Sequence, residues 1–176
     1  MFGQFLRKHS ISAGILLFLR VYLGWAWLTA GWSKVTGDFH AGGYLQGSIA
    51  NPVLKGEAMI YPNYVAFLER FAIPNAELFS FMVAWGEVLV GLGLILGVLT
   101  SAAAFFGVMM NFAFMFAGTI STNPWMLLIS MFILAAGANA GRYGGDRWVL
   151  PYLRHLFMKK SGNSMLDQEK KVIKVA

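Results

Sequence analysis

The sequence contains no cysteine and little charge. Of its 176 residues, 12% are Asp, Glu, Lys or Arg, whereas 57% are apolar. Without cysteine the chain cannot form disulfides, thiolate zinc sites or cysteine-ligated iron–sulfur clusters, so any redox role requires a borrowed cofactor. The apolar composition is typical of membrane proteins. At about 20 residues per span, the length predicts about four transmembrane helices with one sizeable loop and a tail.

Histidine is also scarce, and its placement argues against a bound metal. His9, His40 and His155 lie at or outside the expected membrane boundaries. A bis-histidine haem inside the bundle is therefore disfavoured, and no close pair of ligands indicates a metal site. We also expect no nucleic-acid partner, because the net charge of +6 comes from basic residues that flank apolar segments, as in proteins whose partner is the lipid bilayer.

Four apolar segments predict an all-α fold, namely a polytopic membrane protein with a bundle of four transmembrane helices. The predicted spans are residues 12–35, 76–98, 101–118 and 125–141. Residues 38–75 are too numerous for a simple connector and too apolar for a flexible linker, so we expect an extracytoplasmic helical loop that covers the outer mouth of the bundle. Residues 1–155 then form one membrane domain, and residues 156–176 form a basic tail.

The distribution of basic residues predicts the orientation in the cell membrane. Arg7 and Lys8 precede the first predicted span, and many basic residues follow the last one. The long loop holds only Lys55 and Arg70 and is acidic in comparison. By the positive-inside rule, both termini are expected in the cytoplasm and the long loop outside, which requires an even number of spans.

The first predicted span carries two basic side chains, Arg20 and Lys34, on one helical face. At about 100° per residue, this face also contains three uncharged residues, Gly24, Trp27 and Gly31. A guanidinium inside a span costs about 2.5–3.5 kcal/mol, so Arg20 should face a partner or a polar cavity.

Glu87, in the second predicted span, is the expected partner of Arg20. If Ser12 and Val98 both mark the cytoplasmic boundary, Arg20 lies about 12 Å and Glu87 about 16 Å from it. Asn111 lies at a similar depth of roughly 15 Å. We therefore predict a buried ion pair between Arg20 and Glu87 in one polar layer with Asn111. The pair is either a structural device or a site that also contacts substrate or protons.

Three segments resemble the DoxX family of small four-helix membrane proteins. They are RVYLGWAWLTAGWSK in the first span, WGEVLVGLGLILGVLT in the second and GANAGRYGGDRWV at the end of the fourth. The long loop, with YPNYVAFLE, and PNAELFS after it are more similar to the DoxD branch, named for the small subunit of a thiosulfate:quinone oxidoreductase. The resemblance covers about residues 12–155. In the family pattern, residues recur that correspond here to Arg20, Lys34, Glu87, Gly141, Arg142 and Asp146.

The resemblance implies a membrane component of a quinone-linked oxidoreductase, or a factor that handles quinones and oxidative stress. Quinone would be a ligand or co-substrate, and the partner a membrane or peripheral oxidoreductase subunit. Lys34 would then donate to a quinone carbonyl or an anionic headgroup, with Trp32 and Tyr44 beside it. Alternatively, Lys34 only snorkels to the outer interface.

Two other functions are compatible with the sequence. The first is a non-catalytic membrane scaffold that anchors a partner through its basic tail, since the chain has no redox-active residue. The second is a small transporter or proton pathway, which buried charges suggest and the absence of broken spans disfavours. The pair Gly93 and Gly97 packs helices within the bundle or, alternatively, forms a homodimer.

Overall fold

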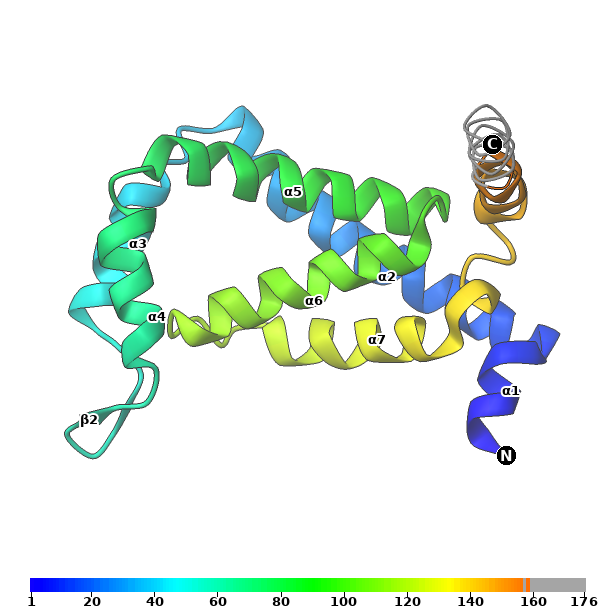
Figure 1. Ribbon diagram of the computed structural model, residues 1–176, viewed down its shortest axis with the longest axis horizontal. Coiled ribbons are helices and arrows are strands. Elements are labelled where there is room, and N and C mark those ends of the chain that lie inside the picture. The colour runs from blue at the N-terminus through cyan, green and yellow to red at the C-terminus, as the bar shows by residue number, and fades with distance from the viewer. Residues whose placement is uncertain (157, 159–176) are drawn as a thin grey trace, which may run out of the picture.

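The computed structural model describes residues 1–156 and 158, so most of the predicted tail lies outside the described residues. Four long helices run alongside one another (Figure 1). They are α2 (Ser10–Thr36), α5 (Ala76–Leu96), α6 (Thr100–Phe116) and α7 (Asn123–Ala136), the last extended by the 3-10 helix η2 (Gly137–Asn139). The only strands in the described part of the chain are β1 (Leu54–Lys55) and β2 (Ala58–Met59), a small antiparallel hairpin. The predicted all-α class is confirmed.

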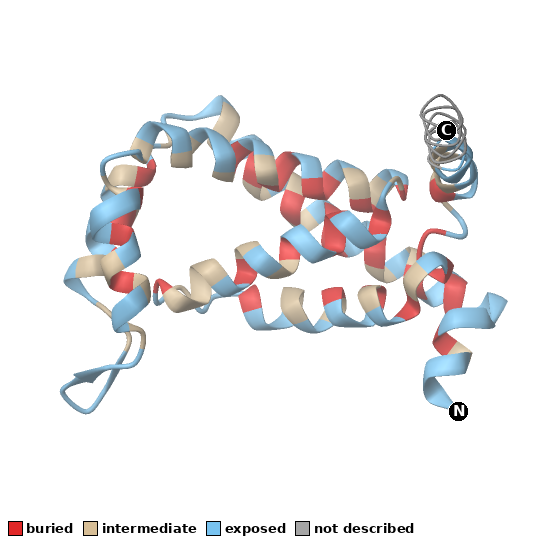
Figure 2. Ribbon diagram, in the orientation of Figure 1, coloured by how far each residue is buried: buried red, intermediate tan, exposed pale blue. Residues whose placement is uncertain are grey.

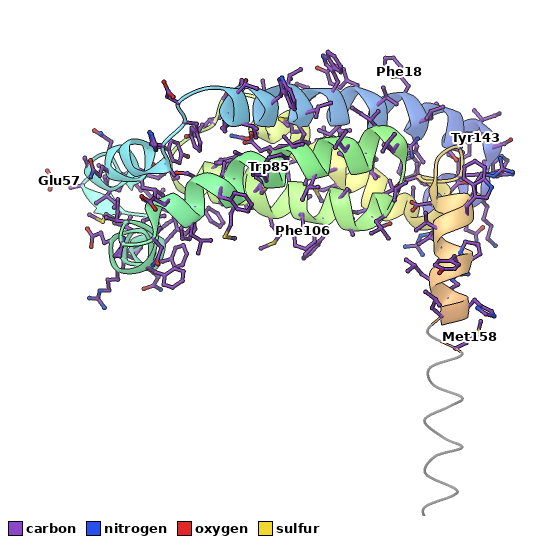
Figure 3. All side chains as sticks on the ribbon, turned by 90° about the horizontal axis from the view of Figure 1, so that it is seen from above. Phe18, Glu57, Trp85, Phe106, Tyr143 and Met158 are labelled. Atoms are coloured by element: carbon purple, nitrogen blue, oxygen red, sulfur yellow. The ribbon has the colours of Figure 1, made fainter. Side chains whose placement is uncertain are left out.

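The outward faces of these helices are strongly apolar, and the buried residues face one another inside (Figure 2). Large apolar side chains such as Phe18 and Phe106 project away from the bundle (Figure 3), and they are 73% and 59% exposed. The helices α2 and α5 are long and apolar enough to cross a membrane, and α6 and α7 are shorter apolar helices. Such an extensive exposed apolar surface is unfavourable in water and suits a lipid environment.

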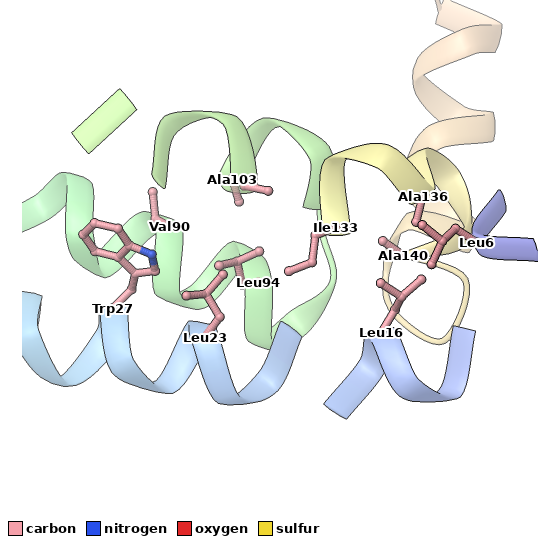
Figure 4. Packing of buried hydrophobic residues seen from close by; sticks show 11 residues of the cluster. Leu6, Leu16, Leu23, Trp27, Val90, Leu94, Ala103, Ile133, Ala136 and Ala140 are labelled. Carbon is pink, nitrogen blue, oxygen red and sulfur yellow. The ribbon is translucent and has the colours of Figure 1, made fainter. Parts of the chain in front are cut away.

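The core of the bundle contains side chains from all four long helices, from α1 and from the turn after η2 (Figure 4). Its buried members are Leu6, Leu16, Leu23, Trp27, Val90, Leu94, Ala103, Ala104, Ile133, Ala136 and Ala140. The small residues of this set lie on α6, on α7 and just after η2, where they allow close helix contact.

A lid covers one end of the bundle. It contains α3 (Ala41–Ala50), the hairpin, α4 (Pro62–Phe67) and the π-helix η1 (Leu68–Ala72). Its own small core consists of Ala41, Leu45, Leu68 and Ala72. The lid is attached to α6, because the hydroxyl of Tyr64 donates to the carbonyl oxygen of Ala113 at 2.9 Å.

The opposite end of the bundle carries α1 (Phe2–Lys8) and the helical residues 146–156. Figure 1 shows both of these segments at the end farthest from the lid. The lid contains two acidic and two basic side chains and so has no net charge, whereas the opposite end of the bundle is basic.

Candidate functional site

The one ion pair among the residues that the structure describes joins α2 to α5. The Nζ atom of Lys34 lies 2.6 Å from Oε2 of Glu87 and also donates to the carbonyl oxygen of Ala30 at 3.3 Å. The Glu87 side chain is 2% exposed and that of Lys34 is 24% exposed. The ring of Phe39, in the loop after α2, lies 5.6 Å from Nζ. The carboxylate is thus held in the interior, whereas the ammonium reaches the edge of the bundle.

Glycines bring the two helices close enough for this pair to form. A Cβ atom on Gly31 would lie 2.6 Å from the backbone nitrogen of Val88 and 2.8 Å from Cβ of Glu87. A Cβ atom on Gly91 would lie 2.6 Å from the backbone nitrogen of Leu28. No larger residue fits at either position without moving a backbone, as in other close helix contacts in membranes. Gly31 therefore sets the level at which α2 meets Glu87.

The predicted ion pair between Arg20 and Glu87 is wrong. Arg20 is 1% exposed, but its guanidinium lies beyond the end of α5, where Nη2 donates to the carbonyl oxygen of Tyr143 at 3.4 Å. Asp146 lies in the same region, since its N–H donates to the carbonyl oxygen of Gly97, against which Arg20 packs. The Nε and Nη1 atoms of Arg20 have no hydrogen-bond partner within residues 1–156 and 158.

The error came from the assumption that α2 and α5 reach the cytoplasmic boundary at the same level. The helix α2 has 27 residues and α5 has 21, and α2 extends past the end of α5. Arg20 consequently lies against Gly97, just after α5, while Gly31 lies against Glu87. The helices are offset by about two turns from the predicted register.

Asp146 joins the end of α5 to the beginning of α6. One carboxylate oxygen accepts a hydrogen bond from the N–H of Leu99 at 2.7 Å, and the other accepts one from the N–H of Thr100 at 3.0 Å. The N–H of Asp146 donates to the carbonyl oxygen of Gly97 at 2.7 Å. Two amide groups at the start of α6 are thereby satisfied, and the negative charge lies at the positive end of the helix dipole.

Three glycines leave room for this arrangement. A Cβ atom on Gly97 or Gly144 would collide with the guanidinium of Arg20. One on Gly141 would collide with the carboxylate of Asp146. Gly97 also has a φ of 65°, in the left-handed region that favours glycine. Arg20, Gly141 and Asp146 are therefore parts of one junction, at which the end of α5, the start of α6 and the turn after η2 meet α2.

A group of interior polar atoms has no hydrogen-bond partner in the described part of the chain. It comprises Nε1 of Trp27 and both Oδ1 and Nδ2 of Asn111, whose side chains are 2% and 0% exposed. A Cβ atom on Gly107 would lie 3.2 Å from Nε1 of Trp27 and 3.3 Å from Val90, so these three residues lie at one level. Asn111 on α6 and Glu87 on α5 each lie about one turn nearer the lid than this level, so these two residues share a layer.

This layer has the chemistry of a site for a small polar group. Buried polar atoms are nearly always hydrogen-bonded, and leaving one unsatisfied costs about 1–3 kcal/mol. The indole N–H of Trp27, the amide of Asn111 and the ammonium of Lys34 are donors, and the carboxylate of Glu87 is an acceptor. Such a set can hold water or the oxygen atoms of a ligand in otherwise apolar surroundings.

The other residues predicted from the sequence lie elsewhere. Trp32 is 57% exposed, so it faces outward and does not line the site around the Lys34–Glu87 pair. The hydroxyl of Tyr44 lies 2.9 Å from Oγ1 of Thr119, and its ring packs edge-on against Phe114. Tyr44 therefore attaches the lid to α6. Arg142 is exposed at the opposite end of the bundle.

Asn139 is a structural residue that the sequence analysis did not single out. Its Nδ2 atom donates to the carbonyl oxygens of Leu6 at 2.7 Å and His9 at 3.0 Å, and it lies 3.1 Å from Oγ of Ser12. It therefore fixes the turn between α1 and α2 against η2. A lone amide within the apolar segment GANAG was the available signal.

Comparisons with known proteins identify one family. The model of the DoxX family matches residues 15–119. The matched region contains Arg20, Lys34, Glu87 and Asn111, and it ends before α7. No curated protein and no solved structure matches the chain.

Proposed function

The chain belongs to the DoxX family of membrane proteins, and on that premise we propose that it is a membrane component of a quinone-linked oxidoreductase, with the quinone beside Lys34 and Glu87. The observation that carries the proposal is the 2.6 Å ion pair, in the same region as polar atoms of Asn111 and Trp27 that have no hydrogen-bond partner among the described residues. A quinone combines an apolar ring with two carbonyl oxygens that accept hydrogen bonds. It requires a few donors within an apolar site.

The residues of this site can bind the ligand and exchange protons. Reduction of a quinone to a quinol consumes two electrons and two protons. The ammonium of Lys34 can give a proton to a carbonyl oxygen, and Glu87, when protonated, can return one to the resulting amine. The electrons would come from a redox group on a partner subunit. Without cysteine the chain offers neither a redox thiol nor a cysteine-ligated cluster of its own. A relationship to the DoxD branch, with its thiosulfate:quinone oxidoreductase, is part of this proposal.

The proposed topology has four spans, with both termini in the cytoplasm and the lid outside. The helix α6 has 17 residues, and α7 has 14 residues and is extended by the 3 residues of η2. These lengths meet the lower limit of about 17 residues for a spanning helix. No charged residue occurs between Val88 and Gly141, as two lipid-embedded helices require. The basic end then faces the cytoplasm.

A second candidate function is a non-catalytic membrane anchor for a partner protein. It is favoured by the surroundings of Arg20 and Asp146, whose buried charges serve to join helices. An anchor would need no ligand at Lys34, and it would co-purify with a stoichiometric soluble partner.

Quinone binding by the purified full-length chain tests the proposal. A short-chain ubiquinone analogue would be titrated in detergent against the wild type, Lys34→Met, Asn111→Leu and the control Lys55→Met, which removes an exposed lysine of the β1–β2 hairpin. We expect Lys34→Met to weaken binding by at least about tenfold, the loss of one charge-assisted hydrogen bond. Lys55→Met should bind as the wild type does.

Asn111→Leu separates a ligand site from a purely structural one. Because the amide of Asn111 lacks partners within residues 1–156 and 158, the substitution should leave the stability of the ligand-free protein unchanged or raise it. It should nevertheless weaken quinone binding. Wild-type affinity in both Lys34→Met and Asn111→Leu would contradict the proposal and favour the anchor.

A further inference from the structure

At the end of the bundle opposite the lid, four arginines surround a concavity of about 350 Å³. Arg7 comes from α1, Arg142 from the turn after η2, and Arg147 and Arg154 from the helical residues 146–156. Segments far apart in the sequence thus direct basic side chains to one place. This concavity is separate from Lys34 and Glu87.

The described residues, 1–156 and 158, do not neutralise the positive charge of this concavity. Asp146 is the one carboxylate in its lining, and both of its oxygens are occupied by the N–H groups of Leu99 and Thr100. The sole ion pair among the described residues is the distant one between Lys34 and Glu87. Four guanidinium groups against one engaged carboxylate leave an excess of positive charge.

Two of the arginines are fixed by the fold, and two are available to a ligand. Nε of Arg7 donates to the carbonyl oxygen of Ala135 at 3.0 Å. Nη1 of Arg142 lies 3.5 Å from the carbonyl oxygen of Lys8. These contacts hold α1 in place, and the other N–H groups of each guanidinium have no hydrogen-bond partner among the described residues. Arg147 and Arg154 make no hydrogen bond or ion pair through their side chains within residues 1–156 and 158.

We propose that this concavity binds the phosphate group of an anionic phospholipid. Guanidinium groups recognise phosphate through paired N–H donors, and several arginines converging on one space match its charge. Basic pockets at the membrane surface bind phospholipid headgroups by this chemistry. The proposal does not depend on quinone binding.

Two features assign the phosphate to a lipid. The lining includes the apolar side chains of Leu150 and Pro151, which suit the glycerol and upper acyl region. Exposed aromatic side chains flank the arginines: Tyr143 is 49% exposed, Trp148 67% and Tyr152 64%. Tyr and Trp in such positions are typical of the membrane–water interface, where phospholipid headgroups lie.

Native mass spectrometry of the full-length protein tests this assignment. The wild type in detergent would be titrated with phosphatidylglycerol, with phosphatidylcholine and with inorganic phosphate. The test variant is Arg147→Gln/Arg154→Gln, which leaves the arginines that hold α1. The matched control is Lys55→Gln/Arg70→Gln, which removes the same charge from exposed positions of the lid.

We expect the wild type to prefer phosphatidylglycerol, and the test variant to bind it at least about tenfold more weakly, since two basic residues that attract an anionic headgroup are lost. The control should retain the preference. If the test variant also loses thermal stability, Arg147→Lys/Arg154→Lys keeps the charge without the paired donors and should bind with intermediate affinity.

Three results would overturn the assignment. Equal binding of phosphatidylcholine by the wild type would show that charge is not recognised. An unchanged preference in the test variant would place the lipid elsewhere. If inorganic phosphate displaced the lipid and depended on the same arginines, the phosphate site would stand but its ligand would be soluble.

Discussion

Lys34 Nζ lies 2.6 Å from Glu87 Oε2, across 53 positions of sequence, and the ion pair fixes α2 against α5. Its two members are unequally placed, since Glu87 is 2% exposed and Lys34 is 24% exposed. The lysine can therefore reach polar surroundings that the carboxylate cannot. This asymmetry decides which half of the pair is more costly to remove.

Removing the lysine should destabilise the protein more than removing the acid. We expect Lys34→Met to lower the free energy of unfolding by about 3 kcal/mol or more, because a buried carboxylate loses its cation. Glu87→Gln should cost less, and the double variant should cost less than the sum of the two. Thermal unfolding in detergent measures all three, and Lys55→Met is the control. Strictly additive losses would mean that the two residues are not coupled.

The burial of Arg20, Glu87 and Asn111 was predictable from the sequence, but the surroundings of each side chain were not. Helical periodicity shows which face of a helix carries a polar residue. The partner depends on how far one helix is shifted along another, and here backbone contacts at Gly31 and Gly91 determine the shift. A glycine in a sequence indicates close packing without showing which residue it packs against.

Local backbone geometry accounts for the other differences. The predicted span 125–141 is interrupted at Gly137, whose φ of 57° ends α7. The β1–β2 hairpin was not predicted, because strands of two residues are too short to show an alternating pattern. The helix α4 was predictable, since Pro62 occupies its first turn.

The junction around Arg20 should not tolerate a methyl group at Gly144. A Cβ atom there would collide with the guanidinium and would lie 2.8 Å from Cα of Gly97. We expect Gly144→Ala to lower the free energy of unfolding by about 1–3 kcal/mol through overpacking. Gly14→Ala is the control, because nothing lies within 4 Å of a Cβ at Gly14 on α2. Equal unfolding temperatures of the two variants in detergent would show that the junction is loosely packed.

The proposed topology can be tested with single cysteines, because the wild type has none. Glu57→Cys places a thiol on the exposed hairpin of the lid, and His155→Cys places one at the opposite end. In intact cells, an impermeant maleimide should label the first variant and should label the second only after permeabilisation. The reverse pattern would invert the orientation, and labelling of both in intact cells would exclude an even number of spans.

The attachment of the lid to α6 should weaken at high pH through Tyr64. Its hydroxyl donates to the carbonyl oxygen of Ala113 at 2.9 Å, and burial, with a smaller contribution from Tyr44, raises the pKa of Tyr64 from 10.0 to about 12. At a pH between these two pKa values, Tyr64 has lost its phenolic proton when the lid is detached and retains it when the lid is attached. The contribution of this group to stability is therefore complete below about pH 10 and is lost as the pH rises through about 12.

Tyr64→Phe should remove this pH dependence, because phenylalanine has no proton to lose. The difference in ultraviolet phenolate absorbance between the wild type and Tyr64→Phe should titrate near pH 12. Limited proteolysis of the lid should increase over the same range in the wild type, and Tyr61→Phe, which alters a tyrosine packed on Phe116, should retain the increase. A difference that titrates near the ordinary value of 10.0 would mean that Tyr64 is in contact with water, and the lid would then be detached from α6 in solution.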